Sequence, residues 1–237
     1  MKKKLFIILF IFLILSCGKK TPPLPIEKSI PKEPSLEIRL TPQGANLFIY
    51  LPTETQGGFP LVKIKKLIIE KTEIPIDIPK AKAKTDTFKL SVNLHSAGNL
   101  FVYPDYNLKH RHKYIYKIKI IKDFIVETPF TESIEIFWHN PPNFPQDFKV
   151  NVLRQDSVLI TWKRPEKDIY GLHLEGEVFY EIEKITEKER KIIEIKGKEE
   201  YFDEIKSGVS TCYNIRAILN FRGTFIPGPK TPDICVK

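Results

Sequence analysis

The 237-residue sequence lacks the short motifs that accompany most catalytic and metal sites. It has no Gly-x-Ser-x-Gly turn for a nucleophilic serine, no glycine-rich phosphate-binding loop and no cysteine–histidine cluster at metal-ligand spacing. Two acids in expected loops, Asp156 and Asp168, have no evident partner in the sequence. These absences predict that the protein is not an enzyme and that it binds no metal or cofactor.

Long apolar runs are also scarce, and the single one present is too short to span a membrane. Leu5 to Leu15 is an unbroken apolar run of 11 residues, which as a helix reaches only ~16 Å of a ~30 Å hydrocarbon core. Three lysines precede the run, and the small residues Ser16, Cys17 and Gly18 follow it. A basic head, a short apolar stretch and small residues together predict a secretory signal peptide.

The end of this segment lacks the Ala-x-Ala pattern of an ordinary secretory cleavage site. Instead, Ile14-Leu15-Ser16-Cys17 resembles the lipobox of bacterial lipoproteins. The resemblance implies that residues 1–16 are removed and that Cys17 carries a diacylglycerol thioether and an acylated amine. Two or more acyl chains attach a protein stably to a membrane. Gly18 stands where enteric lipoproteins kept at the inner membrane have aspartate, so the resemblance implies an outer-membrane protein that faces the periplasm.

Charge of one sign is not concentrated in any segment of the mature chain. The net charge is +9, of which three units belong to Lys2, Lys3 and Lys4, so +6 remains once the signal is removed. Acids and bases alternate closely, as in the run from Glu187 to Lys191. A nucleic-acid interface normally presents a patch of one sign. We therefore expect a solvated surface and no nucleic-acid partner.

Prolines define the segment that follows the lipobox. Five of the seventeen residues from 18 to 34 are proline, a density that disfavours both helices and central strands. Residues 17–34 are therefore predicted to be a lipidated, semi-rigid tether, which would extend roughly 50 Å as a polyproline II helix.

From residue 35 onward the pattern is almost entirely that of β-strands. Short alternating apolar and polar stretches are separated by clusters of proline, glycine and asparagine, which is typical of a β-sandwich. One charged window, Glu183 to Lys196, is interpreted as two strands joined by a turn near Glu187. The other expected strands are Leu36–Leu40, Leu47–Leu51, Ile64–Ile69, Phe88–Leu94, Tyr114–Ile121 and Ser133–Phe137.

An internal repeat divides this β region into two units. The segment from Tyr116 to Phe124 aligns without gaps onto the segment from Tyr213 to Phe221. Upstream, residues 67–71 match residues 180–184, and the first copy has 16 additional residues between the two matched segments. A repeated unit of this size predicts two similar domains in tandem.

The second copy resembles a fibronectin type III domain. In that family an early strand carries a core tryptophan followed by a proline, as in Trp162 and Pro165. A later strand carries a tyrosine followed by alternating apolar residues, as in Tyr213 and Ile215, and the Arg216-Ala217 pair that follows also fits the pattern. The resemblance implies an all-β protein with two tandem immunoglobulin-like sandwiches, at 35–140 and 141–237. In the first copy, Tyr50 or Leu51 is expected to replace the tryptophan.

Two cysteines remain once Cys17 is assigned to the lipid. Residues paired across a hairpin have a constant index sum, and pairing Cys212 with Cys235 centres the hairpin on Gly223-Thr224. Successive side chains of a strand point to opposite faces, and the residues next to each cysteine are expected to point inward. Both cysteines are therefore expected on the outer face of the last strands. Because exported proteins fold in an oxidising compartment, a disulfide between the two cysteines is predicted. Two free thiols are the alternative.

Two further groups of residues are candidates for binding. His110 and His112 share one side of an extended segment, but a metal needs more ligands, so a solvated loop is the preferred interpretation. Phe101, Tyr103 and Tyr106 lie in the extra residues of the first copy, where exposed aromatic side chains can stack on sugars or contact a protein. Packing of these rings onto their own domain is the favoured alternative.

Taken together, these features favour a non-catalytic binding or scaffold module, anchored in the cell envelope, whose partner is another envelope protein. A glycan- or peptidoglycan-binding module that uses the aromatic residues of the first domain is the alternative function.

Overall fold

The computed structural model describes residues 25, 28–92, 99–123 and 126–237. The predicted signal peptide, Cys17 and most of the tether lie outside the described residues. Within the described residues, no helix is long and apolar enough to cross a membrane.

The first domain is a sandwich of two antiparallel sheets. One sheet has the strand order β1-β2-β5 and the other has the order β4-β3-β6-β7. The strands are β1 (Ser35–Thr41), β2 (Gly44–Tyr50), β3 (Lys66–Pro75), β4 (Lys84–Leu90), β5 (Leu100–Asp105), β6 (His112–Ile121) and β7 (Ile134–Trp138).

The second domain repeats this arrangement. Its sheets have the strand orders β8-β9-β12 and β11-β10-β13-β14, and the last strand, β15, also pairs with β13. The strands are β8 (Gln146–Arg154), β9 (Ser157–Lys163), β10 (Glu177–Ile185), β11 (Arg190–Lys196), β12 (Glu200–Glu204), β13 (Thr211–Phe221), β14 (Thr224–Pro227) and β15 (Ile234–Val236). The protein is therefore all-β, with two sandwiches that have the strand order of fibronectin type III domains.

Alternation of side chains along the strands builds the two cores. In β6, Tyr116, Ile118 and Ile120 are buried, whereas Lys117 pairs with Glu70 on the outer face at 2.8 Å. The second core contains Trp162, whose ring lies 5.2 Å from that of Tyr180, together with Val158, Ile160, Ile182, Tyr213, Ile215, Ala217 and Leu219. Period-two burial of this kind is what orients each strand in a sandwich.

The repeated sequence segments occupy the same register in the two domains. Ile69 on β3 lies opposite Ile118 on β6, and Ile182 on β10 lies opposite Ile215 on β13. The window from Glu183 to Lys196 forms the hairpin of β10 and β11, closed at Ile185. Equivalent sequence positions therefore make equivalent pairs.

Two strand-level expectations need correction. The strand expected at Phe88–Leu94 corresponds to β4, but it begins earlier and ends earlier. Its pairing with β3 runs from Lys84 to Leu90, which lies opposite Leu67. Neither Tyr50 nor Leu51 replaces the tryptophan. Ala45 pairs with Asp105 as Val158 pairs with Asp203, so the position of Trp162, four residues after Val158, is that of the buried Ile49.

Strand β5 was not expected from the sequence. The repeat places residues 100–105 among the extra residues of the first copy. They pair with β2 from Tyr50 to Ala45, so this segment completes a sheet of the first sandwich.

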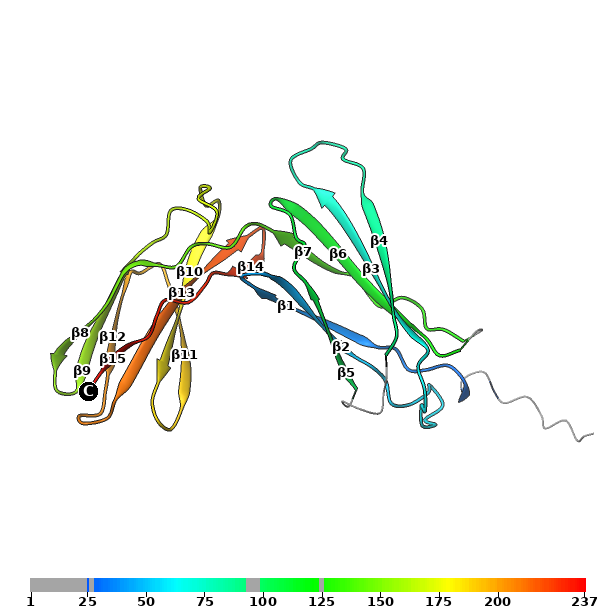
Figure 1. The fold of residues 1–237 in the computed structure, drawn as a ribbon, viewed down its shortest axis with the longest axis horizontal. Coiled ribbons are helices and arrows are strands. Elements are labelled where there is room, and N and C mark those ends of the chain that lie inside the picture. Colours follow the sequence, from blue (N-terminus) through cyan, green and yellow to red (C-terminus); the bar gives the residue numbers. More distant parts are fainter. Residues whose placement is uncertain (1–24, 26–27, 93–98, 124–125) are drawn as a thin grey trace, which may run out of the picture.

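The two sandwiches lie one after the other along the long axis of the molecule (Figure 1). The described chain begins at the outer end of the first domain and ends, at the point marked C, at the outer end of the second. Strands β1, β7 and β14 meet between the two domains, where Phe137 N–H donates to Thr224 Oγ1 at 2.9 Å. The junction is therefore formed by strands and not by a free linker.

Candidate functional site

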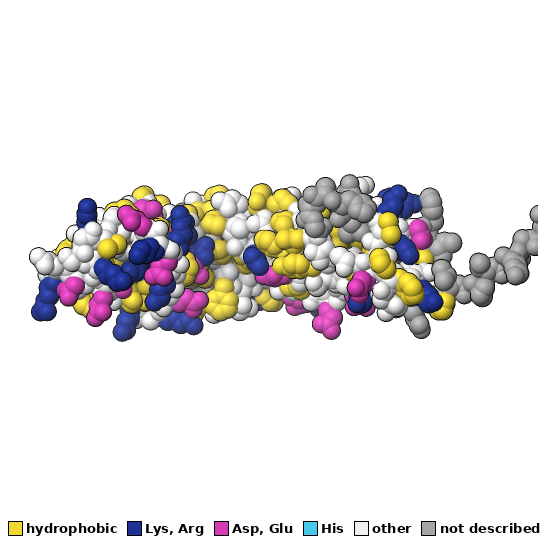
Figure 2. Space-filling view, turned by 90° about the horizontal axis from the view of Figure 1, so that it is seen from below, with side chains coloured by type: hydrophobic (Ala, Val, Ile, Leu, Met, Phe, Trp, Pro, Cys, Tyr) yellow, Lys and Arg dark blue, Asp and Glu magenta, His cyan; other side chains and the backbone are white. Residues whose placement is uncertain are grey.

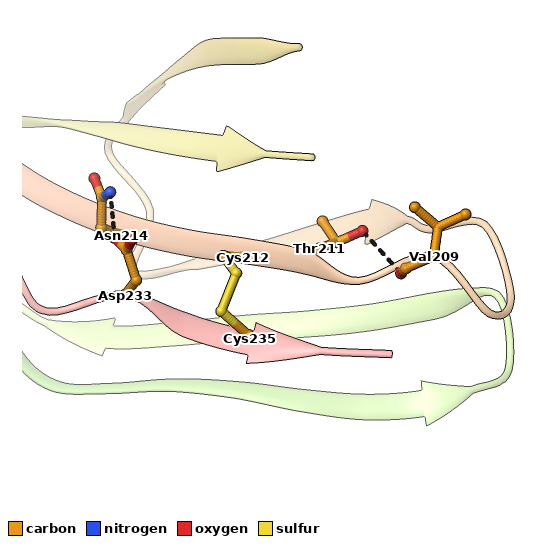
Figure 3. Close-up of a disulfide and its surroundings, with 6 residues drawn as sticks. All are labelled: Val209, Thr211, Cys212, Asn214, Asp233 and Cys235. Atoms are coloured by element: carbon orange, nitrogen blue, oxygen red, sulfur yellow. Dashed lines mark hydrogen bonds between the residues drawn. A yellow bond between two sulfur atoms is a disulfide. The ribbon is translucent and has the colours of Figure 1, made fainter. Parts of the chain in front are cut away.

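The structure joins Cys212 and Cys235 by a disulfide (Figure 3). The two residues lie directly opposite each other on β13 and β15. The turn of the hairpin is one residue earlier than the index sum implies, since Phe221 pairs with Thr224. Two additional residues between Pro227 and Ile234 restore the register at the cysteines, as the pairs on either side show.

The three aromatic candidates do not form a common exposed surface. Phe101 and Tyr103 alternate along β5 and pack, partly buried, against the core of the first domain. Tyr103 lies 5.7 Å from the ring of Phe88, whereas Tyr106 is 58% exposed beyond the end of the strand. The alternative in which these rings pack onto their own domain therefore describes Phe101 and Tyr103, and of the three only Tyr106 is exposed.

The two histidine candidates also separate. His112 lies at the start of β6, where its Nε2 is 3.6 Å from Glu73 Oε1. His110 turns toward the junction, where its ring centroid is 4.3 Å from that of His139 in an edge-to-face arrangement. His110 and His112 therefore do not act together, and the structure gives His110 a different neighbour.

The chain passes between the domains as a buried connector. All five residues from Trp138 to Pro142 are buried. The connector pairs with the β9–β10 loop of the second domain, because Ile169 N–H donates to Pro141 O and Asn143 N–H donates to Lys167 O. A buried and hydrogen-bonded connector restricts motion between domains far more than an exposed linker does.

Asp168 is the central side chain of that loop, and it has partners that the sequence did not reveal. It is 1% exposed. Its Oδ1 accepts the backbone N–H groups of Tyr170 and Leu172 at 2.8 and 2.9 Å, and its Oδ2 accepts Asn140 Nδ2–H at 2.8 Å. The interpretation of Asp168 as a loop acid without a partner was wrong, because its partners come from the turn and from the connector.

Arg111 links the two domains on the outer side of the junction. Its guanidinium makes a bidentate pair with Asp77 of the first domain at 2.6 and 2.7 Å, and it also contacts Glu175 of the second domain. The hydrogen bonds to Asp77 and Glu175 raise the pKa of Arg111. Bidentate guanidinium–carboxylate pairs fix geometry as well as charge.

Beside Arg111, the ring of His110 is partly buried. Desolvation lowers the pKa of His110, and the neighbouring His139 and Arg111 lower it further, while Asp168 acts in the opposite direction. The neutral form of the imidazole, which offers a lone pair, is thereby favoured at this position.

Each domain also contains the same lysine–aspartate–tyrosine cluster between its sheets. In the first domain, Asp105 accepts the Tyr116 hydroxyl at 2.8 Å and pairs with Lys71 at 2.6 Å. The lysine and the aspartate come from opposite sheets, since β3 and β5 lie in different layers. Burial and the adjacent carboxylate raise the pKa of Tyr116.

The second domain repeats the cluster with Asp203, which accepts the Tyr213 hydroxyl at 2.5 Å and pairs with Lys184 at 2.7 Å. Burial and the hydrogen bond to Asp203 raise the pKa of Tyr213. The sequence analysis missed both clusters. Lys71 and Lys184 have the inward parity of the isoleucines two positions before them, and an inward lysine requires a buried acid.

No protein-family model matches the sequence, and no curated protein matches it. Solved structures do match. One is the crystal structure of the FN1-FN3 domains of chicken CNTN1, with 14% identity and a TM-score of 0.46, covering 87% of this chain and 67% of that one. Another is the two fibronectin type-III domain segment from chicken tenascin, with 14% identity and a TM-score of 0.33, covering 87% of this chain and 99% of that one.

Proposed function

We propose that this protein is a lipid-anchored component of a bacterial cell envelope that holds a non-catalytic binding surface at a fixed distance from the membrane for another envelope protein. The observation that carries the proposal is the buried junction, where Arg111 pairs with acids of both domains and the connector is hydrogen-bonded along its length. A two-domain unit with such a junction behaves as one spacer.

The position of the chain ends supports this role. The lipobox cysteine, Cys17, precedes the first domain by the proline-rich segment, and the second domain lies at the far end of the long axis (Figure 1). In the proposed arrangement, attachment through Cys17 presents the second domain farthest from the lipid, facing the periplasm from the outer membrane.

The surface of the second domain fits a protein partner better than a polyanion. Basic and acidic side chains are interspersed on the face seen in Figure 2, with hydrophobic side chains between them. Exposed apolar residues of the β9–β10 loop, on the side of the second domain that adjoins the connector, include Tyr170 at 73% and Leu172 at 50%. Mixed charge around exposed aromatic and aliphatic groups is characteristic of protein interfaces.

A second candidate function, glycan binding, is favoured by one observation. A shallow groove beside β4 and β5 is lined by Phe88, Tyr103 and the exposed Tyr106, together with Lys71 and Asp105. An aromatic ring beside polar groups is a common platform for a sugar. A peptidoglycan pull-down with the wild type and with Tyr106→Ala tests this function: retention that Tyr106→Ala abolishes would support it, and no retention would exclude it.

The anchoring part of the proposal is tested by mass spectrometry of the amino-terminal peptide and by membrane fractionation. We expect a mature wild-type chain that begins at an acylated Cys17 and is found in the membrane fraction. The Cys17→Ala variant should be neither acylated nor cleaved before residue 17. An unmodified cysteine in membrane-associated wild-type protein would contradict lipid anchoring.

The binding part is tested by cross-linking with mass spectrometry in the native envelope. We expect cross-links from second-domain lysines to one envelope protein, lost when Tyr170 and Leu172 are both changed to serine. Cross-links confined to the first domain would contradict the assigned surface without affecting the result on anchoring.

A further inference from the structure

The junction between the domains contains a set of side chains suited to a transition metal. Within the described part of the chain, His110, His139 and Asp168 each offer one ligand atom, and these atoms lie within 4.8 Å of one another. The three come from the β5–β6 loop, the connector and the β9–β10 loop. We propose that these three residues bind one divalent transition metal ion, with Zn²⁺ as its most suitable representative, at the domain junction.

His139 is the strongest argument for a ligand. Its ring is 0% exposed, and its Nε2 has no hydrogen-bond partner among the described residues. Its Nδ1 lies 2.7 Å from Asn140 O, so the neutral ring donates there and keeps its lone pair on Nε2. A backbone carbonyl that orients one ring nitrogen while the other faces a metal is the usual arrangement of a metal-binding histidine.

Asp168 supplies the anionic ligand. It is 1% exposed, and its carboxylate is fixed by Asn140 and by the turn N–H groups of Tyr170 and Leu172. Two imidazoles and one carboxylate form a three-residue set that zinc accepts, with a water in the fourth position. Ligand atoms around tetrahedral zinc are about 3.4 Å apart at bond lengths near 2.1 Å, so atoms that lie within 4.8 Å of one another must move closer when the ion binds.

His110 is the ligand that must rearrange. Its Nδ1 accepts the Asn140 N–H at 3.2 Å, which places the proton of the neutral ring on Nε2. Metal binding therefore replaces this long hydrogen bond or turns the ring over. His110 is partly exposed, so it has the freedom to do so and provides the route by which an ion enters.

The charges around the three residues permit a cation. Arg111, the fixed positive charge that acts on His110, is paired with Asp77 and Glu175. The ion would join a loop of the first domain, the connector and a loop of the second domain. Its binding would therefore tighten the junction, and this consequence does not depend on lipid anchoring or on the identity of the partner.

The test is the zinc content of the intact protein in detergent, measured after equilibrium dialysis against Zn²⁺, together with the thermal melting temperature with and without Zn²⁺. We expect one zinc per chain and a rise in melting temperature on zinc addition. His110→Ala and Asp168→Asn should each lose both effects, and Asn140→Ala should weaken binding about 10–100-fold through the lost support of Asp168.

His112→Ala and His173→Ala are matched controls, since these histidines lie outside the set, and both should keep the wild-type zinc content. Circular dichroism of each variant without zinc establishes that it is folded. If wild-type protein retains no zinc, or if folded His110→Ala and Asp168→Asn retain as much as His112→Ala, the proposal is overturned, and His110 and His139 are then a metal-free ring pair.

Discussion

The two domains share a topology and a buried polar cluster, but they differ in what surrounds it. In the first domain, Lys71 and Asp105 have side chains that are 7% and 8% exposed; in the second, Lys184 and Asp203 are 18% and 12% exposed. The second domain has Trp162 where the first has Ile49, and it adds a disulfide. The same cluster is therefore drier in the first domain, and the second domain has additional sources of stability.

This difference shows how one repeat unit tolerates divergence. The register of β3 with β6 and of β10 with β13 is maintained, and each tyrosine of the cluster lies on the same side of its strand. A charge pair buried between two sheets is destabilised strongly by loss of one partner, since the other charge is left without compensation. Retention of all three residues in both domains follows from that asymmetry.

Core truncation should produce the largest effect, and it should be confined to one domain. Trp162→Ala is expected to cost ~3–5 kcal/mol because a large buried ring leaves a cavity, which could unfold the second domain. Ile49→Ala, at the corresponding place in the first domain, removes fewer buried atoms and should cost less. Urea unfolding followed by fluorescence and circular dichroism measures both; an unchanged curve for Trp162→Ala would refute its place in the core.

Removal of the aspartate from the buried cluster should destabilise the first domain more than the second, the opposite of the order expected for core truncation. Asp105→Asn is expected to destabilise the first domain by about 3 kcal/mol or more, because Lys71 remains buried without its counter-charge. Asp203→Asn should cost less, since Lys184 reaches more solvent than Lys71, while both lysines also donate to a backbone carbonyl. The same unfolding measurement applies, and a larger loss for Asp203→Asn would reverse the comparison.

Removal of the disulfide should affect only the second domain. Cys212→Ser combined with Cys235→Ser opens a loop with a sequence separation of 23, and the chain-entropy model gives a loss of roughly 3 kcal/mol. Thiol titration of unfolded, unreduced wild-type protein provides the matching measurement. It should find neither of these two thiols, and two reactive thiols would show that the bond is absent.

A smaller effect on stability is expected at a pair of equivalent glutamates, one in each domain, whose surroundings differ. Hydrogen bonds from Lys230 and then Asn214 lower the pKa of Glu183 on β10, whereas Glu70 on β3 pairs with Lys117 at a more exposed site. A lowered pKa means that the carboxylate stabilises the folded state fully above pH ~4.3 and progressively less as pH falls through the lowered value.

Glu183→Gln should therefore cost about 1 kcal/mol at neutral pH and show a weaker loss of stability on acidification than the wild type. Glu70→Gln should change stability by no more than a few tenths of a kcal/mol. Thermal melts between pH 3 and 7, chosen to span the ordinary glutamate pKa, measure both. Equal acid sensitivity in wild type and Glu183→Gln would contradict the assignment.

Local patterns predicted most of the fold because alternation and repetition are local properties. The repeated segments that begin at Tyr116 and Tyr213 predicted the two central strands. The alternation of side chains along a strand predicted that Cys212 and Cys235 share one face. The strand at 100–105 was missed because its pairing with β2 depends on a distant segment. His110, His139 and Asp168 are separated by 29 residues at each step, so no local spacing brings them together; the folding of the connector does.

The central claim is that the two domains form one rigid spacer, and the distance between them tests it most directly. Lys89 on β4 and Lys191 on β11 are exposed residues on strands of different domains. Spin labels on Lys89→Cys and Lys191→Cys, with the native disulfide left oxidised, report the separation by pulsed electron paramagnetic resonance. We predict one narrow distance distribution that broadens in Arg111→Ala; a broad distribution in the protein with an intact junction would contradict the account.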